Sequence, residues 1–328
     1  MTRPVGSQSA LITGACGQDG TLLARHLRGL GYRVVGIVRP GTQRGASPDD
    51  IELIEADICD HAAWSKLLSE HAPQEVYHLA TCHHSTEDGV NPSDHQLKKE
   101  MVRTNFLSTK VLAFAVLESG CTCRVVYAGS SQMYSAETSY HEIDESADRK
   151  PSTFYGHTKA WSMELLAELR KDCGLNASTA ILFNHESPLR RPQFVSRKIS
   201  QATAATYRGD PFRLDLLNVG ARTDWSSADD VVRALHLMGI ADRPADFVVA
   251  SGQLHSVRTM LDVAFGHVGL DWKSLVRPQS DVEEPTLVGN ATLLETTLGW
   301  KRRQSFSDMI KQMVDADIAL RDIAHDRR

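Results

Sequence analysis

The sequence predicts an α/β fold built on a doubly wound parallel sheet, and two patterns support this. In the first half of the chain, short apolar runs alternate with longer segments of helical periodicity, which is typical of βαβ units. A glycine-rich turn joins the first apolar run to the first helical segment. Such units place helices on both faces of the sheet and bury its strands.

The individual elements follow from the apolar spacing. Segment 21–30 places Leu23, Leu27 and Leu30 on one helical face, whereas segment 32–38 is rich in β-branched residues. The expected strands are 10–13, 32–38, 51–56, 75–79, 124–128 and 178–183, and the expected helices are 21–30, 61–70, 98–119 and 155–173.

The composition is that of an ordinary globular protein. The 328 residues include 36 Lys and Arg against 41 Asp and Glu, a formal charge of −5, which excludes a strongly basic nucleic-acid binder. The sequence contains no run of about 18 apolar residues, so we expect no membrane-spanning helix. Six scattered cysteines without a CxxC or zinc-ligand spacing indicate reduced thiols. We therefore expect a cytoplasmic protein with no metal site and no nucleic-acid or membrane partner.

The glycine-rich turn has the spacing G-x-x-G-x-x-G at Gly14, Gly17 and Gly20. Gly14 permits the tight turn, Gly17 lets backbone N–H groups approach a pyrophosphate, and Gly20 allows close packing of helix and strand. Between a first strand and a first helix, this motif predicts dinucleotide binding. The alternative interpretation is a tight turn without a ligand.

The end of the second expected strand bears on the choice of dinucleotide. It carries Arg39 and no acidic residue that would hold a ribose 2′-hydroxyl. An arginine there favours a 2′-phosphate, so we expect NADP, with NAD as the alternative. Asp57 and Ile58 follow the third strand, where they can meet the adenine. Arg39 and Asp57 can also be a solvated charge and a simple turn residue.

Beyond residue 184 the alternation loosens. We expect residues 1–184 to form the core of a Rossmann-type dinucleotide-binding domain. Residues 185–328 are expected to form mainly a smaller C-terminal α+β substrate lobe, with crossings back to the first domain. The segments assigned to this α+β region are 247–250, 256–268 and 306–322.

A catalytic constellation is expected after the fifth strand. Tyr155 and Lys159 are four residues apart and share a helical face, where a lysine ammonium lowers the pKa of a phenol. The phenolate then takes a proton from a hydroxyl while hydride leaves the carbon. Ser130 follows the strand, so its hydroxyl can bind the reacting oxygen. The alternative is a surface tyrosine beside a solvated lysine.

Several motifs together resemble the extended short-chain dehydrogenase/reductase family, and within it the GDP-mannose 4,6-dehydratases. The most specific is Asn184-His185-Glu186-Ser187-Pro188. The others are 10–14 with 17–20, 36–39, 194–199, and 247–252 with 255–258. The resemblance implies a nucleotide-diphosphate sugar, GDP-linked, and a bound nicotinamide cofactor that takes hydride from sugar C4. It also implies a homodimer or homotetramer, with helices 98–119 and 155–173 in a four-helix contact.

The resemblance also implies which residues form the site. By this resemblance, oxidation at C4 is carried out by Ser130, Tyr155 and Lys159. The implied cofactor residues are Gly14, Gly17, Gln18, Asp19, Gly20, Arg39, Asp57, Ile58, Leu79, Tyr155 and Lys159. The implied substrate residues are His83, Ser131, Asn184, Arg197, Lys198 and Arg222.

The chain departs from the family pattern at several site positions. Gln132 stands where the dehydratases have a Glu that removes the C5 proton, and an amide is no base at neutral pH. The segment 81–84 is Thr-Cys-His-His instead of Ala-Gln-Ser-His. The Arg expected before Asp-Trp is Thr223, with Arg222 one place earlier. His83 is a candidate replacement base, because imidazole titrates near neutrality; otherwise it is a hydrogen-bonding or packed residue.

These departures leave several functions open. A 4,6-dehydratase needs a base at C5, whereas a nucleotide-sugar 4-dehydrogenase or 4-epimerase needs only the oxidation at C4. A redox-silent nucleotide-binding protein is the alternative from another class. The presence of Ser130, Tyr155 and Lys159 argues against that last alternative.

Overall fold

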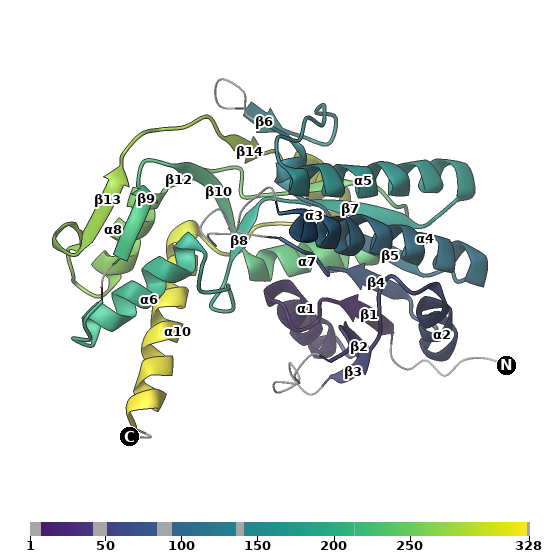
Figure 1. Cartoon of the computed structure of the whole chain (residues 1–328), viewed down its shortest axis with the longest axis horizontal. Coiled ribbons are helices and arrows are strands. Elements are labelled where there is room, and N and C mark those ends of the chain that lie inside the picture. The colour runs from purple at the N-terminus through teal and green to yellow at the C-terminus, as the bar shows by residue number, and fades with distance from the viewer. Residues whose placement is uncertain (1–7, 42–50, 84–93, 136–140, 213, 327–328) are drawn as a thin grey trace.

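The computed structural model describes residues 8–41, 51–83, 94–135, 141–212 and 214–326. Its centre is a seven-stranded sheet in the order β11-β7-β5-β4-β1-β2-β3, with every neighbouring pair parallel (Figure 1). These strands are β1 (Ser9–Thr13), β2 (Arg33–Val38), β3 (Glu52–Glu55), β4 (Glu75–His78), β5 (Arg124–Ala128), β7 (Ala177–Leu182) and β11 (Phe247–Val249). The predicted α/β fold with a Rossmann-type parallel sheet is confirmed.

Helices cover both faces of this sheet (Figure 1). Adjacent residues of β1 face opposite cores: Ile12 packs with α1, α7 and α9, and Leu11 packs with α2, α4 and α5. This is the alternation that a strand buried on both faces requires. The helices are α1 (Gln18–Gly29), α2 (His61–His71), α4 (Ser108–Ser119), α5 (Phe154–Cys173), α7 (Ala228–Gly239) and α9 (Thr292–Leu298).

The long helix expected over 98–119 is interrupted. The structure has α3 (His95–Met101), a π-helical turn at Val102–Leu107, and then α4. Asn105 lies fully buried inside the wide turn, and its backbone carbonyl accepts hydrogen bonds from the side chains of Tyr127, Ser162 and Thr109. A carbonyl with this many side-chain donors belongs to a locally widened helix, so the prediction of one regular helix is wrong here.

A second group of elements, which we call the small lobe, lies beside the sheet at the left of Figure 1. It consists of α6 (Val195–Tyr207), α8 (Val257–His267), α10 (Phe306–Asp326) and the parallel pair β9 (Leu214–Asn218) and β13 (Val276–Ser280). Its separate apolar core includes Ile199, Met260 and Met309. The expected segments 256–268 and 306–322 are found here.

The segment 247–250 was assigned to the wrong part of the fold. Its residues form β11, which pairs with β7 at one edge of the large sheet. Phe247, Val248 and Val249 are all buried there, because helices cover both faces of this edge strand. The chain therefore returns to the sheet after residue 184, with α7, β11 and α9.

Short strands join the two parts. β8 (Asn184–Glu186) follows β7 after one residue and pairs with β10 (Arg222–Ser227), which in turn pairs with β12 (Leu254–Ser256). A further pair, β6 (His141–Ile143) and β14 (Leu287–Gly289), lies near the start of α5. These strands place residues from both parts of the chain at the carboxyl ends of the large sheet.

Membrane-spanning helices and metal-ligand clusters are both absent from the described ranges. Over those residues, no helix combines the length and apolar character that crossing a bilayer requires. The same residues contain no group of three or more His, Cys, Asp or Glu side chains arranged to hold a metal ion. All six cysteines are free thiols.

Candidate active site

The glycine-rich turn after β1 closes only with glycine at two of its positions. Gly14 has φ = +69°, and a Cβ there would lie 3.0 Å from the Ala80 backbone nitrogen. A Cβ on Gly20 would lie 2.3 Å from the Gly14 carbonyl oxygen. Gly17 is the N-cap of α1, and its N–H donates to that same carbonyl at 2.9 Å. The turn therefore presents the N-terminus of α1 as an anion site.

A cavity of about 420 Å³ extends from this turn. It lies where the strand order reverses between β1 and β4, the usual ligand site of such sheets, and its volume suits a small-molecule ligand. The lining residues are Gly14, Ala15, Cys16, Gly17, Ile37, Val38, Arg39, Pro40, Ala56, Asp57, Ile58, Ala80, Thr81, Glu100, Arg103 and Thr104. The predicted residues Gly14, Gly17, Arg39, Asp57 and Ile58 are thus brought together.

Two ion pairs stand at the charged end of this cavity. Arg39 lies 3.5 Å from Glu100, which also accepts a hydrogen bond from Thr104. Asp57 pairs with Arg103, and a backbone hydrogen bond from Cys59 together with Arg103 lowers the pKa of Asp57. Glu100 and Arg103 were missed from the sequence, because no motif distinguishes them from other charges on a helix.

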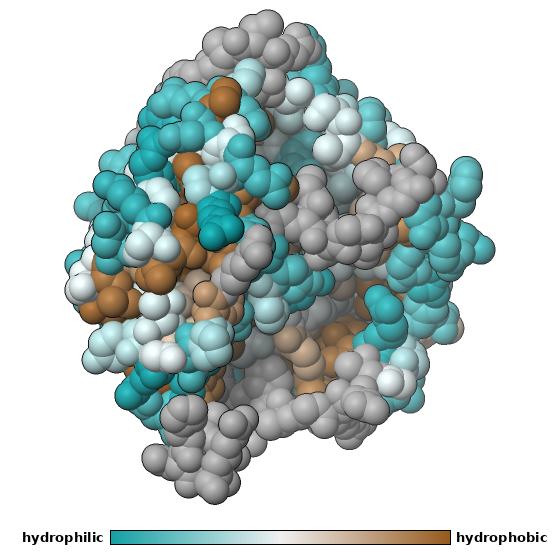
Figure 2. Space-filling model, turned by 60° about the vertical axis from the view of Figure 1, so that its left-hand side comes forward, coloured by the Kyte–Doolittle hydropathy of each residue, from teal (hydrophilic) through white to brown (hydrophobic). Residues whose placement is uncertain are grey.

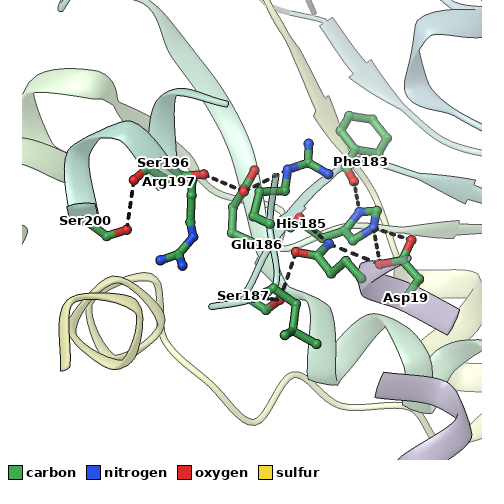
Figure 3. A network of polar contacts seen from close by, with 11 residues as sticks. Asp19, Phe183, His185, Glu186, Ser187, Ser196, Arg197 and Ser200 are labelled. Carbon is green, nitrogen blue, oxygen red and sulfur yellow. Dashed lines mark hydrogen bonds and ion pairs between the residues drawn. The ribbon is translucent and has the colours of Figure 1, made fainter. Parts of the chain in front are cut away.

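Gln18 and Asp19, predicted to bind the cofactor, lie in the first turn of α1, and that role stays a prediction. Neither lines the cavity; both connect α1 to β8 and the residue after it (Figure 3). Gln18 donates to the His185 carbonyl and accepts from Ser187, and Asp19 lies 3.0 Å from His185 Nε2. Burial opposes charge on Asp19, but His185 lowers the pKa of Asp19 to about 2. These residues fasten the glycine-rich turn to the second half of the chain.

Two further predicted cofactor residues act through the backbone. Gly20 lies against the glycine-rich turn, and Leu79 is buried with its carbonyl carbon beside Gly14. Neither residue lines the cavity. Both shape the turn from behind.

Three polar side chains meet beyond the carboxyl end of β5. Ser130 follows β5 by two residues, and Tyr155 and Lys159 lie one turn apart near the start of α5. The hydroxyls of Thr81 and Ser130 lie near the Tyr155 phenol, where each lowers the pKa of that phenol. Lys159 is only 1% exposed, and its Nζ lies 5.7 Å from the centre of the Tyr155 ring. The structure thus brings the predicted trio together, with Thr81 connecting it to the cavity.

The expectation that Lys159 lowers the pKa of Tyr155 stays a prediction, because burial has the largest effect on that pKa in this structure. Burial raises the pKa of Tyr155, although the hydroxyls of Thr81 and Ser130 oppose that rise. Burial also lowers the pKa of Lys159 to about 7. Its Nζ donates to the Ala128 carbonyl at 2.7 Å. The hydrogen bond holds the Lys159 side chain between α5 and the end of β5, one helical turn from Tyr155.

Gln132 and His83 lie side by side next to this trio. Gln132 is in a short 3₁₀ turn, Ser131–Met133, whose N-cap is Ser130. Its Nε2 lies 3.4 Å from His83 Nε2, and its Oε1 accepts from the Thr153 hydroxyl at 3.2 Å. The His83 ring meets the Tyr155 ring edge to face, with centroids 4.6 Å apart. His84 lies outside the described residues.

Asn105 holds the loop that carries Thr81 and His83, and the sequence did not reveal it. Its Oδ1 accepts from the Cys82 N–H at 2.8 Å and from the Thr81 hydroxyl at 3.1 Å. Its Nδ2 donates to the Cys82 carbonyl and to Thr158. The available signal was an Asn, a poor helix former, on the apolar face of an expected helix.

Known proteins share this sequence over most of its length. A sequence profile of the GDP-mannose 4,6 dehydratase family matches residues 11–313. GDP-mannose 4,6 dehydratase 2 of Arabidopsis thaliana is 34% identical over 95% of this chain and 87% of its own length. The chain belongs to the GDP-mannose 4,6-dehydratase family. The human GDP-mannose 4,6 dehydratase is 31% identical over 95% of this chain and 91% of its own.

Solved structures show the same fold at lower identity. UDP-glucose 4-epimerase of Thermotoga maritima superposes with a TM-score of 0.80 at 18% identity, covering 96% of this chain and 100% of its own. DesIV, a dTDP-glucose 4,6-dehydratase of Streptomyces venezuelae, has a TM-score of 0.80 at 20% identity, covering 96% and 98%. This dehydratase-family chain therefore shares its fold with enzymes that carry other names.

Arg197, predicted to bind substrate, is used elsewhere in this family member. It is 6% exposed and pairs with Asp317 of α10, which also accepts a hydrogen bond from Ser200. A buried carboxylate needs a cationic partner, and Arg197 supplies it. The neighbouring Lys198 is half-buried on α6. Arg197 therefore joins two helices of the small lobe, and its substrate contact stays a prediction.

The remaining predicted substrate residues of this dehydratase-family chain fall in three places. Asn184 is exposed at the start of β8, and Ser131 is half-buried in the 3₁₀ turn. Arg222 lines a second cavity of about 510 Å³, whereas Thr223 does not, because successive residues of β10 face opposite sides. That cavity is lined by Gly220, Arg222, Leu254, His255, Ser256, Arg258, Thr259, Asp281 and Glu283.

Proposed function

We propose that this protein oxidises C4 of a GDP-linked hexose, as the opening step of a 4,6-dehydratase-type reaction. The observation that carries the proposal is the meeting of Ser130, Tyr155 and Lys159 beside the cavity at the glycine-rich turn. Thr81 contacts Tyr155 and also lines that cavity. Tyr155 therefore lies where a hydroxyl proton and a hydride can leave the same carbon.

A nicotinamide cofactor fits the first cavity, and when bound it supplies the hydride acceptor. The glycine-rich turn offers N–H groups to a pyrophosphate. Arg39 and Arg103 place two cations at the charged end, which supports NADP over NAD. Among proteins of this fold, RMD of Pseudomonas aeruginosa is described with NADPH and DesIV with NAD. NAD is the alternative that the binding experiment in the Discussion separates.

A GDP-linked substrate is supported by the names of the relatives and by the second cavity. Arg222 and Arg258 both line that cavity, and guanidinium groups bind phosphates in bidentate fashion. Figure 2 shows the molecule turned with the small lobe forward, where hydrophilic and hydrophobic side chains are intermixed around a hollow. The small lobe would thus hold the nucleotide while the sugar reaches Tyr155.

A second function is favoured by one specific observation. Gln132 is exposed at the site, and its amide is not a base. A nucleotide-sugar 4-dehydrogenase or 4-epimerase would use Ser130, Tyr155 and Lys159 without removing a C5 proton. The test below distinguishes these outcomes by product mass.

We also propose a cytoplasmic homodimer formed through α4 and α5. Three large apolar side chains on this side are exposed, namely Leu107 at 41%, Phe114 at 37% and Trp161 at 39%. Exposed apolar clusters of this kind mark protein interfaces. The free thiols suit a reducing compartment.

The test is incubation of the purified protein with GDP-mannose and, separately, GDP-manno-heptose, with either cofactor present. Loss of one water supports the dehydratase, and loss of two hydrogens with accumulation of reduced nicotinamide supports the dehydrogenase. An unchanged mass with an altered sugar indicates the epimerase. Tyr155→Phe should abolish every outcome while retaining cofactor binding, and Tyr207→Phe, at an exposed tyrosine, is the matched control. Wild-type turnover in Tyr155→Phe would exclude the assigned role.

A further inference from the structure

The unusual feature of the site is the contact between Gln132 and His83. A 4-keto sugar loses water from C5 and C6 only if a base removes the C5 proton and an acid protonates the departing hydroxyl. We infer that His83 is this base and acid, and that Gln132 is the residue that positions it. The inference rests on the proposed function, because the C5 hydrogen becomes acidic only beside a C4 ketone.

The neighbouring side chains at the site have other chemistry. Tyr155 is committed to the C4 hydroxyl, and Lys159 is buried with its Nζ on the Ala128 carbonyl. Gln132 carries no ionisable group. His83 presents an imidazole 3.4 Å from the Gln132 amide nitrogen and edge to face with Tyr155. It is therefore the base placed to reach the carbon next to C4.

Two aromatic rings contact the His83 ring, and the backbone before it is fixed. Tyr155 contacts it edge to face, with ring centroids 4.6 Å apart, and Phe194 stacks on it with centroids 6.1 Å apart and planes at 14°. The preceding residue, Cys82, is fixed at its backbone N–H and carbonyl by Asn105. A base that is aligned before substrate arrives gives up little entropy on reaction.

The contacts of Gln132 determine which ring nitrogen of His83 carries a proton. Thr153 donates its hydroxyl hydrogen to Gln132 Oε1, so the amide Nε2 faces His83 and donates to its Nε2. A ring nitrogen that accepts this bond has no proton of its own, and the proton of the neutral ring lies on Nδ1. At 3.4 Å the bond is long, so a substrate can displace the amide and meet the exposed lone pair.

The step balances within the 4-keto sugar. His83 Nε2 takes the C5 proton, and the electron pair of the C5–H bond forms the enolate with C4. The enolate then restores the ketone, a double bond forms between C5 and C6, and the C6–O bond breaks. The imidazolium returns its proton to the departing hydroxyl, so the products are water, a 4-keto-5,6-alkene and neutral His83.

The test follows the C5 hydrogen in D₂O with GDP-mannose as substrate. Wild-type protein should lose one water and gain deuterium at C5. His83→Asn should still reduce the bound cofactor in a single turnover, but water loss and C5 exchange should fall by about a hundredfold or more. His157→Asn, at an exposed position on α5, should behave as wild type.

Two further variants separate a catalytic from a merely structural His83. Gln132→Glu in the His83→Asn background should restore water loss, because it supplies a carboxylate base at the neighbouring position. His83→Gly should recover C5 exchange when free imidazole is added. Failure of both rescues, or full water loss in His83→Asn, overturns the inference. C4 oxidation without C5 exchange in the wild type overturns it while leaving the proposed function intact, and no C4 oxidation at all removes the proposed function itself.

Discussion

Lys159 donates from Nζ to the Ala128 carbonyl at 2.7 Å, and does so from a position that is 1% exposed. The bond ties α5 to the last residue of β5 directly under the site. Burial lowers the pKa of Lys159 from 10.5 to about 7. Because burial disfavours the charged form, a protonated Lys159 destabilises the folded protein.

The buried ammonium should lower the free energy of unfolding in a pH-dependent way, and Lys159→Met should remove that effect. Below pH 7 both folded and unfolded chains hold the lysine proton, so the buried ammonium destabilises the wild type fully. Between pH 7 and 10.5 only the unfolded chain holds it, so wild-type stability recovers as pH rises. The free energy of unfolding of Lys159→Met minus that of wild type should therefore fall by on the order of 2–5 kcal/mol between pH 6 and 10. Urea unfolding at both pH values measures it, and a constant difference would contradict the assigned burial.

The parts of the site that could be predicted from sequence are those set by neighbours along the chain. The tight turn at Gly14 needs a positive φ, and the i, i+4 spacing of Tyr155 and Lys159 needs only a helix. Both requirements involve only neighbouring residues, so the sequence pattern predicts the turn and the helix directly.

The parts that could not be predicted depend on contacts between distant segments. Arg197 is of a residue type that often binds anionic ligands. Its ion pair with Asp317, 120 residues further along the chain, could not be inferred from the local sequence. Segment 247–250 is too short to indicate which sheet it joins, and pairing with β7 decides that. The raised pKa of Tyr155 likewise follows from burial, which no spacing rule reports.

Arg39 and Glu100 predict opposite effects on cofactor choice. Arg39→Ala should raise the Kd for NADPH about tenfold to a hundredfold and leave that for NADH nearly unchanged, because it removes a charge-assisted contact to the 2′-phosphate. Glu100→Gln should tighten NADPH binding about twofold to fivefold, because the competing carboxylate at 3.5 Å is gone.

Isothermal titration of the purified protein with each dinucleotide measures both effects. Glu118→Gln, at an exposed glutamate that pairs with His61, is the matched control and should leave both affinities unchanged. Equal losses of NADPH and NADH binding in Arg39→Ala would show that Arg39 does not read the 2′-phosphate.

Asn105 predicts a coupled loss of stability and activity. Asn105→Ala removes four side-chain hydrogen bonds at a fully buried position and leaves the Cys82 N–H and carbonyl without partners. The free energy of unfolding should fall by about 2–4 kcal/mol. Turnover should fall more than cofactor affinity, because the loop that carries Thr81 and His83 is released.

Asn218→Ala tests whether burial is the cause. Asn218 also makes four side-chain hydrogen bonds, with Val282, Glu284 and Gly220, but at a half-buried position. The free energy of unfolding of Asn218→Ala should fall by less than about 1 kcal/mol, and turnover should be normal. Denaturant unfolding and steady-state kinetics on both variants give the comparison, and equal losses in the two would remove the special role of Asn105.

The exposed apolar side chains of α4 and α5 predict a dimer that a single charge disrupts. Trp161 is 39% exposed and lies beside Phe106 and Phe154, with ring centroids about 6 Å away. Trp161→Glu would place a carboxylate in the centre of the proposed contact, where burying an unpaired charge is costly. Light scattering should find the wild type as a dimer and this variant as a monomer. Leu320→Glu, at a more exposed leucine on α10, should remain dimeric, and a monomeric wild type would show that α4 and α5 face solvent.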